Sequence, residues 1–212
     1  MLEMLSNLVT LVSRSFTGIM SEKELAESST SLSNNETSLM VTKRKDYLCW
    51  WDYFMSMAYI ASMRSKDPNT QVGACIVNED NRIVGLGYNG MPNHCSDDDL
   101  PWNRVSKNPL NTKYLYVCHA EMNAILNKNS ESCKNCSIFV IMFPCNECSK
   151  MIIQSGIKRV VYLCDKYPND PKFQSSRFLL EMAGIEIIQY TPKQRKVVID
   201  FNHFLDQSSL DQ

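Results

Sequence analysis

Two short motifs in the sequence combine residue types that bind a metal and move protons. The first holds His119 and, two positions later, Glu121. The second holds Cys145 and Cys148 in a Pro-Cys-x-x-Cys pattern. One histidine and two cysteines make a three-ligand zinc set, and a catalytic zinc keeps its fourth position for water. Glu121 is not needed as a ligand, so we expect it to transfer protons.

Together, H-x-E and P-C-x-x-C form the signature of the zinc-dependent nucleobase deaminases. Zinc lowers the pKa of a bound water molecule towards 7. Glu121 would accept a proton from that water and pass it to N3 of a cytosine ring, and the resulting hydroxide would attack C4. Glu121 would then carry a proton to the amino group, which leaves as ammonia. Burial moves the pKa of such a carboxyl towards neutrality, which suits both transfers.

The two motifs must meet at the ends of helices. Residues two apart in the middle of a helix point about 200° apart. His119 and Glu121 can therefore share a site only if the site lies at the N-terminal end of their helix. Cys145 and Cys148 should begin a helix that follows a strand, where exposed N–H groups and the positive helix end stabilise thiolates.

Hydrophobic periodicity predicts a hairpin followed by alternating helices and strands. A first helix, with apolar residues at helical spacing from Trp51, is expected to run to about residue 64, and further helices are expected over residues 119–128, 147–155 and 173–183. Strands are expected over residues 71–77, 82–88, 137–142, 159–164 and 185–190. This order indicates an α/β fold with a mixed sheet and helices on both of its faces. The long aperiodic segment 89–116 is typical of a functional loop.

Composition divides the chain of 212 residues into three parts. We predict a flexible N-terminal extension over residues 1–42, a zinc-dependent deaminase domain over 43–201 and a C-terminal tail over 202–212. The net charge of −1 and the lack of a long apolar run argue against a nucleic acid polymer or a membrane as partner. Nine cysteines without a signal-peptide pattern favour a reducing compartment, and we expect a cytoplasmic protein.

Other potential metal ligands leave alternatives open. Cys133 and Cys136 form a second C-x-x-C, which could join the first in a structural four-cysteine zinc site. That site would leave the histidine and the glutamate unexplained, so we expect free loop thiols instead. His94 and Cys95 could help to bind a second metal, although no clear further ligands stand near them in the sequence.

The sequence resembles the deoxycytidylate deaminase family from about residue 44 to residue 201. Beyond the two zinc motifs, the similar segments are RSKDPN (64–69), VGA (72–74), GYNGMPN (87–93), CSDD (95–98), LPW (100–102) and DKY (165–167). One departure is His94, which stands where close relatives are expected to have Gly.

The resemblance implies a cytidine-deaminase-like three-layer sandwich, with a five-stranded mixed sheet between helices. It implies zinc on His119, Cys145 and Cys148, with Glu121 as the proton shuttle. It also implies hydrolytic deamination of dCMP to dUMP and ammonia, which supplies dUMP for thymidylate synthesis. Members of the family commonly form hexamers, so we expect a homo-oligomer.

Substrate contacts can be placed on the sequence with the help of the resemblance. In the related tRNA adenosine deaminases, an Asn at the place of Asn89 contacts the sugar, although an Asn-Gly pair is also a plain turn. Val72 and Ala120 are expected beside it. Lys166 and Tyr167 follow the C-terminal end of a predicted strand and are candidates for the 5′-phosphate. Their alternative is a solvated loop.

The resemblance further implies activation by dCTP and inhibition by dTTP at a separate site. The segment 89–102 is the expected place, with Asn89, Gly90, Asp97 and Asp98 as candidate residues. Its carboxylates would repel a triphosphate unless Mg²⁺ or nearby cations offset them, so we expect Mg²⁺ with the nucleotide. The alternative is a solvated acidic loop.

Three other functions remain open at this point. A deaminase acting on RNA or DNA would need a basic, aromatic-lined channel around the same zinc site. A deaminase of free nucleosides would lack a phosphate pocket. A zinc-binding interaction module without activity would have no use for Glu121.

Overall fold

The structure is a computed structural model that describes residues 41–205. Most of the predicted extension and residues 206–212 of the predicted tail lie outside the described residues. The chain divides into two compact units, Met1–Tyr47 and Leu48–Gln212. Every helix and strand discussed below lies in the second unit, while the predicted domain limits stay a prediction. Within residues 41–205, no helix is both long enough and apolar enough to span a membrane.

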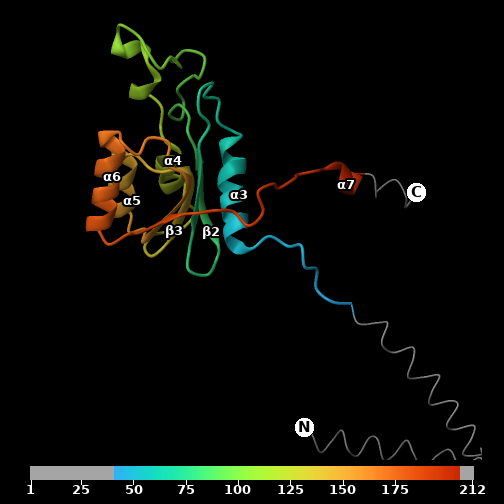
Figure 1. Ribbon diagram of the computed structural model, residues 1–212. Coiled ribbons are helices and arrows are strands. Elements are labelled where there is room, and N and C mark those ends of the chain that lie inside the picture. Colours follow the sequence, from blue (N-terminus) through green and yellow to red (C-terminus); the bar gives the residue numbers. More distant parts are fainter. Residues whose placement is uncertain (1–40, 206–212) are drawn as a thin grey trace, which may run out of the picture. The chain divides into compact units, whose positions relative to one another are not determined.

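One mixed sheet forms the centre of this unit (Figure 1). It has five strands in the order β2-β1-β3-β4-β5. β1 pairs antiparallel with both β2 and β3, whereas β3, β4 and β5 run parallel. The strands are β1 Gly73–Val77, β2 Ile83–Tyr88, β3 Ser137–Met142, β4 Arg159–Cys164 and β5 Glu186–Gln189.

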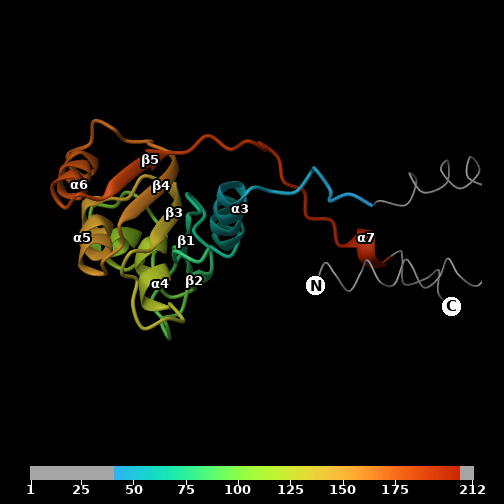
Figure 2. The same ribbon diagram turned by 90° about the horizontal axis from the view of Figure 1, so that it is seen from below.

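Helices cover both faces of the sheet, which confirms the predicted three-layer α/β sandwich. Helix α3 (Trp50–Ser62) lies on one face, and α4 (Ala120–Leu126), α5 (Asn146–Gln154) and α6 (Pro171–Met182) lie on the other (Figure 2). The shorter helical segments are η2 Pro109–Asn111, η3 Lys113–Leu115 and α7 Asn202–Leu205.

Glycines on β1 and β2 let the helices approach the sheet closely. A Cβ at Gly73 would lie 1.8 Å from the carbonyl oxygen of Ala58 in α3. A Cβ at Gly87 would lie 2.3 Å from the carbonyl oxygen of Ala120 in α4. Backbone therefore packs directly on backbone at both places, and β2 determines where the first turn of α4 lies.

The predicted element boundaries hold to within a few residues, with local causes for the differences. Helix α6 begins two residues earlier than predicted because Asp170 caps it, accepting a 2.8 Å hydrogen bond from the backbone N–H of Lys172. Pro171 then occupies the first helical position, where its missing N–H costs nothing. Helix α3 begins at Trp50 and ends at Ser62, two residues before the predicted end near residue 64.

Two sequence expectations about single residues gain a structural explanation. His94 has a φ of 67°, in the left-handed region that favours glycine, which agrees with the Gly expected there in relatives. Cys133 and Cys136 are free thiols in a turn, as predicted. They are, however, 1% and 3% exposed and pack in the hydrophobic core, which the prediction of loop thiols did not anticipate.

Candidate active site

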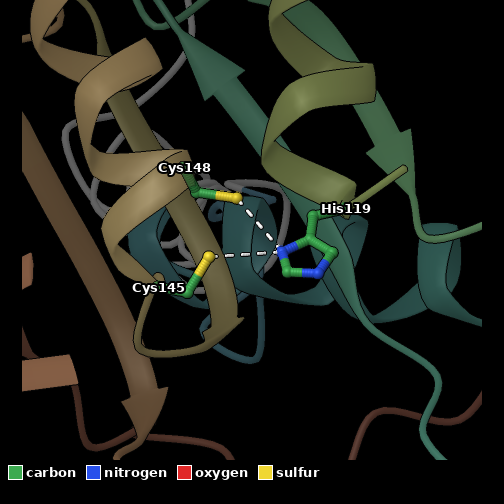
Figure 3. Close-up of side chains that lie close together, drawn as sticks. All are labelled: His119, Cys145 and Cys148. Carbon is green, nitrogen blue, oxygen red and sulfur yellow. Dashed lines mark hydrogen bonds between the residues drawn. The ribbon is translucent and has the colours of Figure 1, made fainter. Parts of the chain in front are cut away.

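The predicted metal ligands come together at the N-terminal ends of two neighbouring helices. His119 is the N-cap of α4 and Cys145 is the N-cap of α5, each with extended backbone angles. In Figure 3 both sulfur atoms point at the imidazole of His119. The distances to its Nδ1 are 3.4 Å from Sγ of Cys145 and 3.3 Å from Sγ of Cys148. The prediction that this histidine must stand at a helix end is therefore confirmed.

These three ligand atoms fit a zinc ion. All three lie within 4.8 Å of one another. Zinc–sulfur and zinc–nitrogen bonds of about 2.3 and 2.0 Å at a tetrahedral centre place N and S about 3.5 Å apart. The separations of 3.3 and 3.4 Å match that arrangement. Among the described residues, no other group of three or more His, Cys, Asp or Glu could hold a metal, so the alternative metal sites do not form.

The electrostatics of the protein chain by itself already favour one thiolate. A hydrogen bond from Cys148, together with the His119 imidazole, lowers the pKa of Cys145 to about 3. The same pairing raises the pKa of His119 to about 9, chiefly through its hydrogen bond with Cys145. The pKa of Cys148 is raised well above its usual value, because its thiol donates to Cys145 and is buried. A zinc ion would displace these protons and ionise both thiols.

Glu121 lies in the first turn of α4, close to these ligands but not among them. It is 4% exposed, and burial raises the pKa of its carboxyl, an effect partly offset by the His119 imidazole. A carboxyl with a raised pKa can both accept and release protons near neutral pH. Its place beside a three-ligand metal set is the arrangement that hydrolytic deamination requires.

Buried serines, which sequence reasoning missed, fix the loop that carries Cys145. Ser176 of α6 donates a 2.7 Å hydrogen bond to the carbonyl oxygen of Pro144, just before Cys145. Ser149 of α5 lies 2.6 Å from the same serine oxygen, and both serines are fully buried. Since Ser176 is 32 residues from Pro144 in sequence, no local pattern indicated this contact.

The residues predicted to contact the nucleoside also gather beside the metal ligands. Gly90 and Cys118 form an antiparallel bridge with N···O distances of 3.1 and 2.9 Å, which brings Asn89 opposite His119. The Asn89 side chain is 6% exposed, and its Oδ1 accepts a 2.8 Å hydrogen bond from the backbone N–H of Val72. Ala120 is fully buried as the first residue of α4.

The two phosphate candidates, Lys166 and Tyr167, lie in the loop after β4, and Arg104 brings a second cation close to Tyr167. The Lys166 ammonium lies 5.4 Å from the centre of the Tyr167 ring. Arg104, from the long loop, donates a 3.2 Å hydrogen bond to the hydroxyl of Tyr114. Two phenols raise the pKa of Arg104, with a larger effect from Tyr114 than from Tyr167, because the guanidinium lies near both. In the described part of the chain, neither Arg104 nor Lys166 pairs with a carboxylate.

The four candidate residues for a regulatory nucleotide are distributed over two places. Asn89 and Gly90 border the metal ligands, as described above. Asp97 forms an ion pair with Lys66, and its backbone carbonyl accepts a 2.9 Å hydrogen bond from the indole of Trp102. Asp98 is exposed, with its N–H donating to Ser96 at 3.2 Å. Lys66 thus supplies a cation that partly offsets the acidic loop.

A cavity of about 240 Å³ lies away from these residues, beside the start of β4. Its lining includes Trp51, Phe54, Lys158 and Arg159. Both cations already pair with carboxylates, Lys158 with Glu79 and Arg159 with Glu186. Among the described residues, the cavity offers no free charged group of this kind, so the candidate active site is the one formed by the metal ligands.

Comparison with known proteins agrees with this site. Residues 49–164 match the family model described as the cytidine and deoxycytidylate deaminase zinc-binding region. The chain is 59% identical over 160 residues to a Homo sapiens deoxycytidylate deaminase, covering 76% of this chain and 90% of that protein. It is 48% identical over 170 residues to a Drosophila melanogaster probable deoxycytidylate deaminase, covering 78% and 84%.

A solved structure shares the fold. It is the crystal structure of dCMP deaminase from the cyanophage S-TIM5 in complex with dCMP and dUMP. It matches with a TM-score of 0.53 and 27% identity, over 66% of this chain and 95% of that chain. The chain therefore belongs to the cytidine and deoxycytidylate deaminase family and is a deaminase of the hydrolase class.

Proposed function

We propose that this protein hydrolyses dCMP to dUMP and ammonia and so supplies dUMP for thymidylate synthesis. The observation that carries the proposal is the set of His119, Cys145 and Cys148 around one point, with the buried Glu121 beside it. The names of its relatives, deoxycytidylate deaminases of high identity, support dCMP as the substrate. The relative bound to dCMP and dUMP has the same fold and supports the same substrate and product.

The roles of the residues follow from where they lie. His119, Cys145 and Cys148 would hold a zinc ion, which when bound lowers the pKa of a water molecule towards 7. Glu121 would take a proton from the attacking water and deliver it to N3 of the cytosine ring as the water oxygen bonds to C4. It would then carry the proton of the new C4 hydroxyl to the amino group as the C4–N bond breaks, and ammonia would leave. Its raised pKa lets one carboxyl serve as base and then as acid.

Recognition of the nucleotide is assigned to two groups of residues. Asn89, with Val72 and Ala120 beside it, borders the metal ligands and is proposed to contact the sugar. Lys166 and Tyr167, joined by Arg104, are proposed to bind the 5′-phosphate. Two cations without carboxylate partners within residues 41–205 suit an anionic group, because a phosphate gives each of them charge-assisted hydrogen bonds.

The deciding experiment measures ammonia release from dCMP, from deoxycytidine and from a short single-stranded DNA. We expect rapid turnover of dCMP alone, and we expect Lys166→Met to reduce kcat/KM for dCMP but not for deoxycytidine. Lys172→Met, an exposed lysine on α6, serves as the matched control and should change neither. Equal efficiency on dCMP and deoxycytidine would refute the phosphate site. Turnover of DNA alone would refute the substrate.

Regulation by nucleotides is part of the proposal. dCTP with Mg²⁺ is proposed to activate a homo-oligomer, a hexamer, and dTTP to inhibit it, through the segment 89–102 with Asn89, Gly90, Asp97 and Asp98. The ion pair between Lys66 and Asp97 supports this place, since it lowers the repulsion between the loop and phosphates. The same assay, run with each triphosphate and with neither, should give a sigmoidal dCMP curve that dCTP makes hyperbolic. Three identical curves would contradict the regulation and leave the catalytic proposal intact.

A further inference from the structure

A buried ion pair outside the metal site connects two loops that border it. Lys113, in η3, is 7% exposed, and its ammonium binds the carboxylate of Asp67, which is 2% exposed. Among the described residues, the members of all other ion pairs are more exposed to solvent than these two. Burying two charges is costly unless further hydrogen bonds satisfy them. The remaining contacts of this pair therefore indicate what it holds in place.

The Asp67 carboxylate binds the side chain of Asn89. It accepts a 3.2 Å hydrogen bond from Nδ2 of Asn89, as well as hydrogen bonds from the backbone N–H groups of Asn69 and Thr70 at 2.8 and 3.3 Å. Nδ2 of Asn89 also donates to the carbonyl oxygen of Thr70 at 2.9 Å. On the other side, Oδ1 of Asn89 accepts from the N–H of Val72.

This arrangement allows only one orientation of the Asn89 amide. A flipped amide would turn its NH₂ group towards the N–H of Val72 and its oxygen towards the carboxylate of Asp67, which would be repulsive on both sides. Both amide protons are already used, and Oδ1 has two lone pairs of which one is taken. The side chain can therefore offer a ligand an acceptor but no donor.

The constrained amide lies beside the reaction centre. The bridge between Gly90 and Cys118 brings Asn89 opposite His119. Lys113 belongs to the segment that leads into His119. Its carbonyl oxygen accepts hydrogen bonds from the N–H groups of Tyr116 and Val117 at 3.0 and 2.9 Å. The ammonium thus couples the segment that leads into His119 to the loop that holds Asn89.

We propose that Lys113 and Asp67 are positioning residues for substrate binding, which act by fixing the amide of Asn89 as an acceptor. The inference rests on the proposed function, in which Asn89 contacts the sugar. A 2′-deoxynucleoside 5′-phosphate has a single sugar hydroxyl, the 3′-OH, and a hydroxyl that donates to Oδ1 is the contact that the fixed amide permits.

The test combines Lys113→Met with Asn89→Ala in the full-length zinc enzyme. Lys113→Met should raise KM for dCMP about tenfold, the equivalent of one lost hydrogen bond in a charged network, and change kcat little. Glu121 and the zinc ligands keep their contacts, so the chemical step is spared. The double variant should have the KM of Asn89→Ala alone, since Lys113 acts through Asn89. Lys158→Met, whose partner Glu79 is exposed, is the matched control and should resemble the wild type.

Several outcomes would overturn the inference. An unchanged KM in Lys113→Met would do so, and so would additive effects in the double variant, because Lys113 would then act by another route. If Lys113→Met does not fold, the double variant Lys113→Met/Asp67→Asn replaces it, because this variant leaves no unpaired buried charge. If that variant folds, binds zinc and has the wild-type KM, then Lys113 and Asp67 serve only the stability of the fold. An inactive wild type would refute the proposed function instead, so the two failures are distinguishable.

Discussion

At the scale of single residues, the site depends on a carboxyl that is close to the metal ligands without joining them. Glu121 is buried and has a raised pKa, and it occupies the first turn of α4 directly after the N-cap His119. A structural zinc site would gain nothing from burying a carboxyl there, because burial costs free energy. The placement fits the proposed role of Glu121 in moving protons.

Glu121→Gln should remove turnover while leaving the metal site complete. Glutamine is nearly isosteric but cannot carry a proton, so we expect kcat for dCMP to fall about 10²–10⁴-fold at unchanged zinc content. The matched control is Glu147→Gln. Glu147 follows the N-cap Cys145 of α5 by two residues, as Glu121 follows the N-cap His119 of α4, but Glu147 is exposed. The assigned role is wrong if Glu121→Gln keeps more than about a tenth of the wild-type rate.

The sequence predicts the site residues that belong to short motifs. It does not predict the residues that reach the site from distant positions in the chain. The helix-end position of His119 followed from helix geometry and is confirmed, and the three residues predicted as zinc ligands lie together in the structure. The partner that fixes Asn89 is Asp67, 22 residues away, and its counterion Lys113 is 46 residues from it. Sequence spacing carries no signal for such contacts, so they became visible only in the fold.

At the scale of elements, β2 positions the helix that carries the candidate catalytic residues. Gly87 gives the first turn of α4 room to lie against the strand, and α4 carries both its N-cap His119 and the buried carboxyl of Glu121. The strands and helices themselves were predictable from hydrophobic periodicity and from caps. The close approach of two backbones was not, because a glycine in a strand is compatible with a bulge, a bend or tight packing.

Gly87→Ala should displace α4 and weaken zinc binding. The added Cβ would lie 2.3 Å from the carbonyl oxygen of Ala120 and 2.3 Å from the backbone nitrogen of Ala124, and backbone atoms can yield only if the helix moves. We expect about 1–3 kcal/mol of lost stability and at least about a tenfold lower zinc affinity in a chelator competition. Gly73→Ala, which crowds α3 on the opposite face, is the control. It should destabilise the fold without a matching change in the zinc affinity of the folded protein.

At the scale of the whole unit, a buried carboxylate ties the first helix to the end of the sheet. Asp52 of α3 is 3% exposed and accepts a 2.8 Å hydrogen bond from the hydroxyl of Tyr190, just after β5. It also accepts from the backbone N–H groups of Lys193 and Gln194 at 3.1 and 3.2 Å. Asp52 therefore anchors the segment that follows β5, although Lys193 in that segment is 141 residues away from Asp52 in the sequence.

This anchor gives the fold a pH dependence of defined sign. Burial alone would raise the pKa of Asp52, but hydrogen bonds from Tyr190 and Cys49 and from the backbone of Gln194 and Lys193 outweigh it and lower the pKa. A group whose pKa is lower in the folded chain stabilises the fold above its unfolded pKa of about 3.9. That contribution is lost as the pH falls through the folded pKa.

Asp52→Asn should therefore destabilise the protein at neutral pH and cease to matter in acid. The amide can accept at one atom only, which leaves buried donors unpaired, so we expect a loss of about 1–3 kcal/mol in the free energy of unfolding at about pH 7. Urea unfolding of the variant and the wild type should give free energies that converge as the pH falls through the lowered pKa of the wild-type carboxyl, because that carboxyl then loses its charge. Zinc is lost from both proteins in acid and cancels in the difference. Asp80→Asn, in the exposed turn between β1 and β2, should match the wild type at neutral and at acid pH. A difference that stayed constant down to acid pH would mean that the segment is held by packing and not by the charge of Asp52.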